Sequence, residues 1–286
     1  MAWTLIWGQP WVRADLREAL TIVAFGDSTT APREVEGKPL TVYADILRKE
    51  LPSKGMKVDV VNAGARGDTT ADATKRLTTD VLSHEPDVVI VQFGANDAMV
   101  DLWKSPPATQ PRVAIEAYEK NLRTIVRTLC DRGAKVVLMT PNRFRWTKGL
   151  KRRYGKPPYQ PNDPDGFNVL LKTYAEIVHR IADEERGKVV LVDVYEAFGA
   201  YGQVAGQSVD DLLLDGIHPN TAGHRLVADR LINELVRMRA ESPTTRPSGN
   251  QSHSCGLAPK DHCLPLQSWP NPASSWAAYL RQEKSA

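Results

Sequence analysis

Phe25-Gly26-Asp27-Ser28-Thr29-Thr30 is the stretch that decides the fold. It continues the apolar run at 20–25, Leu-Thr-Ile-Val-Ala-Phe, which is typical of a buried first strand in a parallel sheet. Gly26 lets the backbone turn sharply because it has no Cβ atom to clash. Ser28 would then stand at the carboxyl end of the strand, where open α/β sheets place their ligands. Its hydroxyl is therefore a candidate nucleophile.

A second stretch, Asp215-Gly216-Ile217-His218-Pro219, supplies the base that such a serine needs. Asp215 and His218 are three residues apart on one short loop, so the carboxylate can accept from one imidazole nitrogen while the other nitrogen faces Ser28. We therefore predict a catalytic triad of Ser28, His218 and Asp215. Asp210 and Asp211 are rivals for the carboxylate, but they lack the three-residue spacing.

Two more blocks, Asn-Ala-Gly at 62–64 and Gly-Ala-Asn-Asp at 94–97, each follow a strand-like run. Gly64 offers a backbone N–H with no side chain in the way, and Asn96 offers an amide donor. Together with the N–H of Ser28, these groups predict an oxyanion hole with three donors. Asp27 and Asp97 are expected to be structural, since a carboxylate after a strand can accept backbone N–H bonds that hold its loop.

The four blocks together resemble the GDSL, or SGNH, hydrolase family, whose name lists residue types found here as Ser28, Gly64, Asn96 and His218. The resemblance extends over about 21–238 and implies a flavodoxin-like, doubly wound α/β fold. Its parallel sheet would have five strands in the order 2-1-3-4-5, with helices on both faces. Membership implies a Ser-His-Asp esterase or acyl hydrolase that uses no metal or other cofactor. The chain departs from the family pattern only slightly, with Thr29 and Thr30 after the serine in place of Leu or Ile.

Strand-like and helix-like segments alternate along the chain, which by itself favours a doubly wound parallel sheet. The expected strands are 20–25, 57–62, 87–93, 135–140 and 189–193. The expected helices are 42–51, 69–82 with Asp68 as its N-cap, 114–130, 167–185, and 221–238 with Asn220 as its cap. Residues 31–40 are expected to form a polar loop beside the site.

The chain of 286 residues is long enough for one domain of this kind with extensions. We place the hydrolase domain at 20–240, an N-terminal extension with three tryptophans at 1–19, and a poorly ordered, Pro- and Ser-rich tail at 241–286. The net charge of +3 gives no argument for nucleic acid. No apolar run reaches the roughly 18–20 residues that span a membrane. The short apolar N-terminus lacks a basic segment, which favours a cytoplasmic location over a secreted protein without its leader.

The tail carries His253, Cys255, His262 and Cys263. Their spacing fits no zinc pattern, so we predict no metal site there. A disulfide between Cys255 and Cys263 is an option if the protein is exported. The oligomeric state stays open.

Residues 142–159 contain seven basic residues and no acidic residue, with four aromatic side chains interleaved. This segment follows the fourth strand and so leaves the same edge of the sheet as Ser28. It is either a solvated surface loop or a rim that binds an anionic or sugar-bearing substrate. Arg143, Arg145 and Trp146 are the candidate rim residues.

The favoured function is hydrolysis of short-chain acyl esters of a small molecule or carbohydrate, because no long apolar lid or groove-forming helix is evident. The alternatives are a carbohydrate O-acetylesterase, then a lysophospholipase or thioesterase, and an acyltransferase. A binding module that keeps the fold without the chemistry is the alternative outside the enzymes. The intact Ser28, Asp215 and His218 argue against it.

Overall fold

The computed structural model describes residues 19–241. Nearly all of the predicted N-terminal extension lies outside the described residues. So do the predicted tail from 242 onward and its candidate cysteine pair.

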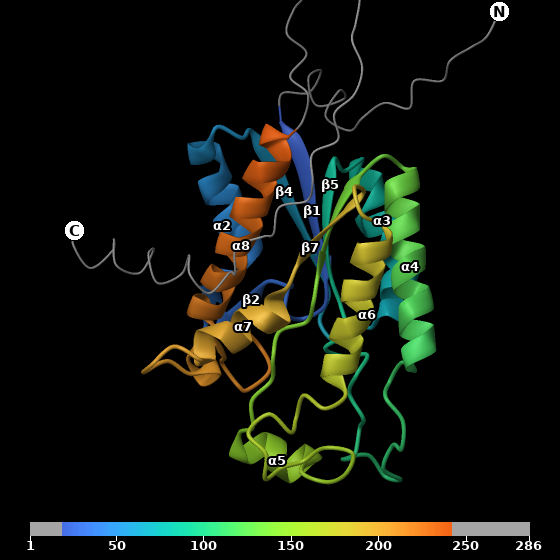
Figure 1. Cartoon of the computed structure of the whole chain (residues 1–286), viewed down its shortest axis with the longest axis vertical. Coiled ribbons are helices and arrows are strands. Elements are labelled where there is room, and N and C mark those ends of the chain that lie inside the picture. The colour runs from blue at the N-terminus through green and yellow to red at the C-terminus, as the bar shows by residue number, and fades with distance from the viewer. Residues whose placement is uncertain (1–18, 242–286) are drawn as a thin grey trace, which may run out of the picture. The chain divides into compact units, whose positions relative to one another are not determined.

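A parallel sheet of five strands forms the centre of the domain (Figure 1). The strands are β1 (Leu20–Gly26), β4 (Val58–Gly64), β5 (Val88–Gln92), β6 (Lys135–Met139) and β7 (Val189–Val192). Their order across the sheet is β4-β1-β5-β6-β7, with every neighbouring pair parallel. Renumbered along the chain, this is the predicted order 2-1-3-4-5, so the expectation for the fold is confirmed.

Helices cover both faces of the sheet (Figure 1). One face carries α3 (Thr70–Asp80), α4 (Ile115–Asp131) and α6 (Leu171–Glu184), and the other carries α2 (Tyr43–Glu50), α7 (Val194–Gly202) and α8 (Thr221–Ala240). The side chains of β1 alternate between the two cores: Val23 and Phe25 face the first, while Ile22 and Ala24 face the second. This double burial explains why the strand is apolar throughout rather than alternating.

Several short elements differ from the sequence prediction. Residues 31–40, expected to be a loop, contain an antiparallel hairpin of β2 (Arg33–Val35) and β3 (Lys38–Leu40). Its turn holds Glu36 and Gly37 at positive φ, as a type I′ hairpin turn requires. Helices α5 (Lys148–Tyr154) and α7 were not predicted, nor were the three 3₁₀ turns η1 (Leu51–Lys54), η2 (Leu82–His84) and η3 (Val209–Leu212).

Two predicted helix starts are wrong. The N-cap of α3 is Thr69 rather than Asp68, whose carboxylate instead pairs with Arg76. The helix expected from 167 begins at Leu171, because Phe167 is buried in the core and Asn168 exchanges hydrogen bonds with the backbone of Phe144. Asn220 caps α8 as predicted, accepting from the N–H of Gly223.

Candidate functional site

Ser28 lies in a tight turn directly after β1. The carbonyl of Asp27 accepts from the N–H groups of Thr30 and Ala31, which closes the turn. A Cβ atom on Gly26 would lie 2.2 Å from the hydroxyl oxygen of Thr30. The turn can therefore fold back on the strand only because residue 26 is glycine, and this places Ser28 at the carboxyl edge of the sheet.

The structure brings the three predicted triad residues together. Ser28 Oγ lies 3.0 Å from His218 Nε2, and His218 Nδ1 lies 2.8 Å from Asp215 Oδ2. The other carboxylate oxygen of Asp215 accepts from the backbone N–H groups of Ile217 and His218 at 3.0 and 2.9 Å. Asp215 thus orients the imidazole and also holds the loop that carries it.

These contacts also keep Asp215 ionised. Partial burial acts to raise the pKa of this carboxyl, but hydrogen bonds from the His218 side chain and from the backbone of His218 and Ile217 outweigh it. They hold the pKa of Asp215 well below its usual value. A carboxylate that stays negative beside the ring can stabilise the imidazolium that forms when His218 takes a proton.

Asn96 lies on the loop after β5 with both ends of its amide fixed. Its Nδ2 donates to the carbonyl of Asp68 at 3.0 Å, and its Oδ1 accepts from Arg112 Nη1 at 2.9 Å. An amide nitrogen carries two N–H groups, so one remains for a ligand. The guanidinium of Arg112 is itself held by Asp101, which it contacts at 2.8–3.2 Å. Sequence reasoning missed Arg112, because it is distant from Asn96 along the chain and belongs to no block.

Gly64 does not fit the role of an oxyanion donor. Its N–H already donates to Asn62 Oδ1 at 2.9 Å. A Cβ atom at this position would lie 2.3 Å from the backbone nitrogen of Ala31, so residue 64 must be glycine to let the turn of Ser28 pack against β4. Its importance is steric, which the sequence cannot distinguish from a donor role.

Gly67 has the features expected of the missing donor. It follows β4 by three residues and adopts φ +83°, and a Cβ atom built there would meet nothing within 4 Å. Asp68, the next residue, accepts from Asn96, so the two segments are adjacent. Within residues 19–241 no hydrogen bond engages the N–H of Gly67 or of Ser28.

Asp27 and Asp97 lie fully buried behind the site. In each, Oδ1 accepts an N–H and a hydroxyl bond, from Thr29 for Asp27 and from Thr70 for Asp97. Burial raises the pKa of Asp27 to about 6 although the Thr29 bonds oppose it, and burial also raises the pKa of Asp97. Asp27 holds its own loop, as the sequence analysis expected, whereas Asp97 fixes the first residue of α3 to the loop after β5.

The three candidate rim residues make contacts within the protein. Arg143 donates to the carbonyl of Tyr195 and pairs with Glu196, while Arg145 pairs with Asp165 and Asp210. Trp146 stacks on Phe167 with ring centroids 4.5 Å apart. The backbone N–H of Arg145 donates to Gly216 at 2.8 Å, so this segment supports the loop of His218.

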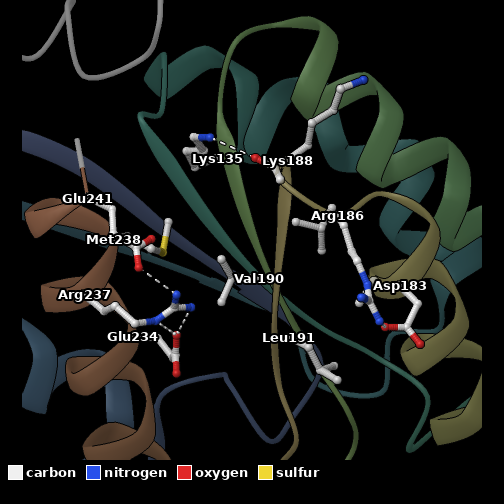
Figure 2. Close-up of a pocket in the computed structure, with 13 residues that line it drawn as sticks. Lys135, Asp183, Arg186, Lys188, Val190, Leu191, Glu234, Arg237, Met238 and Glu241 are labelled. Atoms are coloured by element: carbon white, nitrogen blue, oxygen red, sulfur yellow. Dashed lines mark hydrogen bonds and ion pairs between the residues drawn. The ribbon is translucent and has the colours of Figure 1, made fainter. Parts of the chain in front are cut away.

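A separate hollow of about 460 Å³ lies at β7 and the adjoining ends of α6 and α8 (Figure 2). Charged side chains line it, and most of them bind one another: Arg186 pairs with Asp183, and Arg237 pairs with Glu234 and Glu241. Lys135 donates to the carbonyl of Gly187. The hollow does not include Ser28 or His218.

Among the described residues, no helix combines the length and the apolar character that crossing a membrane requires. The same residues contain no group of three or more His, Cys, Asp or Glu side chains arranged to hold a metal ion.

Comparison with known proteins identifies the family of this chain. The sequence model of the GDSL-like Lipase/Acylhydrolase family matches residues 24–226. The chain is 26% identical to an acetylxylan esterase of Geobacillus stearothermophilus over 66% of this chain and 77% of that protein. It is 31% identical to the uncharacterized lipoprotein YqeF of Bacillus subtilis, over 76% and 90% of the two chains.

Among solved structures, a lipase/acylhydrolase from Enterococcus faecalis superposes with a TM-score of 0.58 at 27% identity. The match covers 77% of this chain and 96% of that one. The chain therefore belongs to the GDSL-like lipase/acylhydrolase family and is a carboxylic ester hydrolase.

Proposed function

We propose that the chain is a serine esterase that hydrolyses short-chain acyl esters through Ser28, His218 and Asp215. The contact of 3.0 Å between Ser28 Oγ and His218 Nε2 carries this proposal, because it joins a nucleophile to a base already oriented by a carboxylate. A binding module would have no need of this arrangement.

The reaction proceeds in two steps. His218 takes the proton of Ser28 as the hydroxyl oxygen attacks the ester carbonyl, and the carbonyl oxygen becomes an oxyanion. His218 then gives the proton to the leaving alcohol, which leaves an acyl group on Ser28. A water molecule, deprotonated by His218 in turn, attacks this acyl-enzyme. His218 then returns the proton to Ser28 Oγ as the bond between Oγ and the acyl group breaks and the carboxylic acid leaves.

The oxyanion is held by the N–H groups of Ser28 and Gly67 and by the amide of Asn96, with Gly67 in place of Gly64. The support for Gly67 is its unengaged N–H and its neighbour's contact with Asn96. Donors fixed before the reaction begins stabilise the developing charge without reorganising, which is usually the largest single contribution to catalysis.

The preference for short acyl chains rests on the small number of exposed large apolar side chains. In residues 19–241 these are Trp103, Val204, Leu214 and Val236. A carbohydrate O-acetylesterase is the second candidate, favoured by the similarity to the acetylxylan esterase. A lysophospholipase or thioesterase, or an acyltransferase that uses an alcohol in place of water, follows as the third candidate.

Hydrolysis of p-nitrophenyl acetate, butyrate and octanoate tests the acyl preference. We expect kcat/KM to fall from acetate to octanoate, because few large apolar side chains are exposed on the described surface to bind a long chain. Acetylated xylan, with released acetate as the readout, tests the second candidate in the same preparation. A rate that peaks at octanoate would overturn the short-chain assignment.

Asn96 and Arg112 should act as one unit in stabilising the oxyanion. Asn96→Ala is expected to lower kcat for p-nitrophenyl acetate by roughly 10²–10³-fold, because one oxyanion donor is lost. Arg112→Met should lower kcat by a smaller factor with little change in KM, because the amide loses the contact that fixes its orientation. In the Asn96→Ala background, Arg112→Met should then cost little more.

The double-mutant comparison separates positioning from general damage. An Arg112→Met effect that persists in full without the Asn96 amide would mean that Arg112 acts through another part of the structure. Arg123→Met is a matched control, since Arg123 also pairs with acidic side chains but lies on α4 in contact with Glu119 and Glu184.

A further inference from the structure

Helix α5 and the residues after it expose five cations: Lys148, Lys151, Arg152, Arg153 and Lys156. We call this set the α5 cationic face. Figure 1 shows α5 beyond the carboxyl ends of the strands. Ser28 follows the carboxyl end of β1 and so belongs to the same edge of the sheet. The five charges exceed the net charge of +3 of the whole chain, so the remainder of the chain is net negative. Anions in solution are therefore drawn to this face in particular.

These cations have no ionic partners within the described part of the chain. Between residues 19 and 241 no ion pair involves any member of the α5 cationic face, although the nearby Arg143 and Arg145 both pair with carboxylates. An isolated run of like charges on a short helix repels itself, which is a cost that a bound polyanion would remove. The face is thus available to an external ligand.

The inner side of α5 fixes the orientation of this face. Leu150 and Tyr154, four residues apart, point inward, and Tyr154 is buried against Tyr159 and Phe167. Thr147 caps the helix by accepting from the N–H of Leu150. The aromatic side chains of this segment therefore anchor α5, and this packing fixes the backbone positions from which the charged side chains extend.

The helix that carries the α5 cationic face packs against the loop that carries Asp215 and His218. Gly216, between Asp215 and His218, adopts φ +89°, and a Cβ atom there would lie 2.8 Å from Leu150 Cδ1 and 3.0 Å from Thr147 Cγ2. The first turn of α5 therefore packs against the residues that orient the base. A long molecule with an ester at Ser28 has this face within reach.

Trp103 extends the face toward the other side of the site. Its side chain is 48% exposed, and the guanidinium of Arg153 lies over the ring at 4.1 Å. Its Nε1 donates to Asp101, the carboxylate that holds Arg112. An exposed apolar ring among cations suits a ligand with both sugar rings and negative charges.

We propose that the α5 cationic face with Trp103 binds an acidic polysaccharide, a chain of sugars that bears uronic carboxylates, whose O-acyl groups are cleaved at Ser28. This deepens the proposed esterase function and rests on it. Five cations spread along a helix suit an extended polyanion better than a single small anion, which would need donors converging on one point. A lipid surface is less well matched, because Trp103 is the one exposed large apolar side chain at this face in the described residues.

Binding of polygalacturonate to the full-length Ser28→Ala protein tests the proposal without turnover. The variant Lys148→Gln/Lys151→Gln/Arg152→Gln should weaken this binding by roughly 3- to 100-fold, since each of the three exposed ion pairs contributes on the order of 1.5- to 5-fold. Neutral xylan should bind far more weakly than polygalacturonate to the parent protein. Salt at about 0.5 M should remove most of the difference between the two polymers.

Two further variants serve as matched controls. Lys49→Gln/Lys54→Gln/Lys57→Gln removes three exposed cations from the other part of the molecule around α2 and should change binding less than twofold. Lys148→Arg/Lys151→Arg/Arg152→Lys keeps the charge and should keep the affinity. Equal losses in the two glutamine variants would overturn the proposal, because the attraction would then be general.

Competing ligands decide the class. The competitors are single-stranded DNA and vesicles of anionic phospholipid. The proposal would also be overturned if either bound more tightly than polygalacturonate and lost affinity to the same extent in the α5 glutamine variant. Polygalacturonate binding could behave as expected while the wild-type protein cleaves no acyl ester. That result would support the binding role of the α5 cationic face and contradict the proposed esterase function, so the two proposals can fail separately.

Discussion

Ser28→Ala should abolish almost all ester hydrolysis. Removal of the nucleophile of a serine hydrolase lowers kcat by roughly 10⁵–10⁶-fold, and the residual rate comes from binding and the oxyanion donors. The substitution deletes one oxygen atom from a partly exposed residue whose side-chain contact is with His218, so the fold should not change. The measurement is kcat for p-nitrophenyl acetate, with thermal unfolding of both proteins alongside.

Ser83→Ala provides the control for this change. Ser83 is an exposed serine in η2 whose hydroxyl donates to the carbonyl of Thr79, far along the chain from the site. The Ser83→Ala variant should retain full activity. Near-normal turnover by Ser28→Ala would instead show that another group is the nucleophile, and the mechanism would have to be abandoned.

Asp215→Asn should lower kcat by about 10⁴-fold while leaving the fold intact. The asparagine Oδ1 can still accept from the N–H groups of Ile217 and His218, so the loop keeps its shape. Its Nδ2, however, would donate to His218 Nδ1, which favours the tautomer that cannot take the proton of Ser28. The loss should appear in kcat, measured by initial rates at saturating p-nitrophenyl acetate.

Asp210→Asn tests whether the effect is specific to the triad. Asp210 pairs with Arg145, is about as exposed as Asp215, and is one of the rivals considered from the sequence. Its substitution should change kcat by no more than a few-fold. If Asp215→Asn retained activity within tenfold of wild type, the orienting role assigned to Asp215 would be wrong.

The residues of the triad could be identified from the sequence because their relation is partly local. A glycine turn after an apolar strand places Ser28, and a three-residue spacing pairs Asp215 with His218. The alternation of strands and helices indicated a parallel sheet. The order of its strands came from the family resemblance, since local periodicity does not say which strands are neighbours.

The oxyanion donors show where sequence reasoning ends. Gly64 and Gly67 are both glycines shortly after the same strand, and only the contact between Gly64 N–H and Asn62 tells them apart. The contact between Arg112 and Asn96 forms because the chain after Asp101 folds back toward Asn96, and no local sequence pattern describes this return. The assignments of Gly67 and of Arg112 therefore both depend on tertiary contacts.

The missed short elements have different causes. The N-cap of α7, Asp193, accepts from the N–H of Glu196, a signal that the sequence does contain. Helix α5 is a weaker case: its cluster of like charges is unfavourable for an isolated helix, and its stability comes from Leu150 and Tyr154 packing below it.

The separation of Ser28 and His218 by 190 residues has a consequence for when the enzyme becomes active during synthesis. Helix α8, directly after His218, packs on α2 near the start of the chain: His224 Nδ1 accepts from Tyr43 N–H, and Arg225 pairs with Glu50. A growing chain therefore carries its nucleophile early and acquires its base only when nearly the whole domain has left the ribosome. A chain that stops before His218 lacks the base altogether, so an ester assay reports on completed molecules alone.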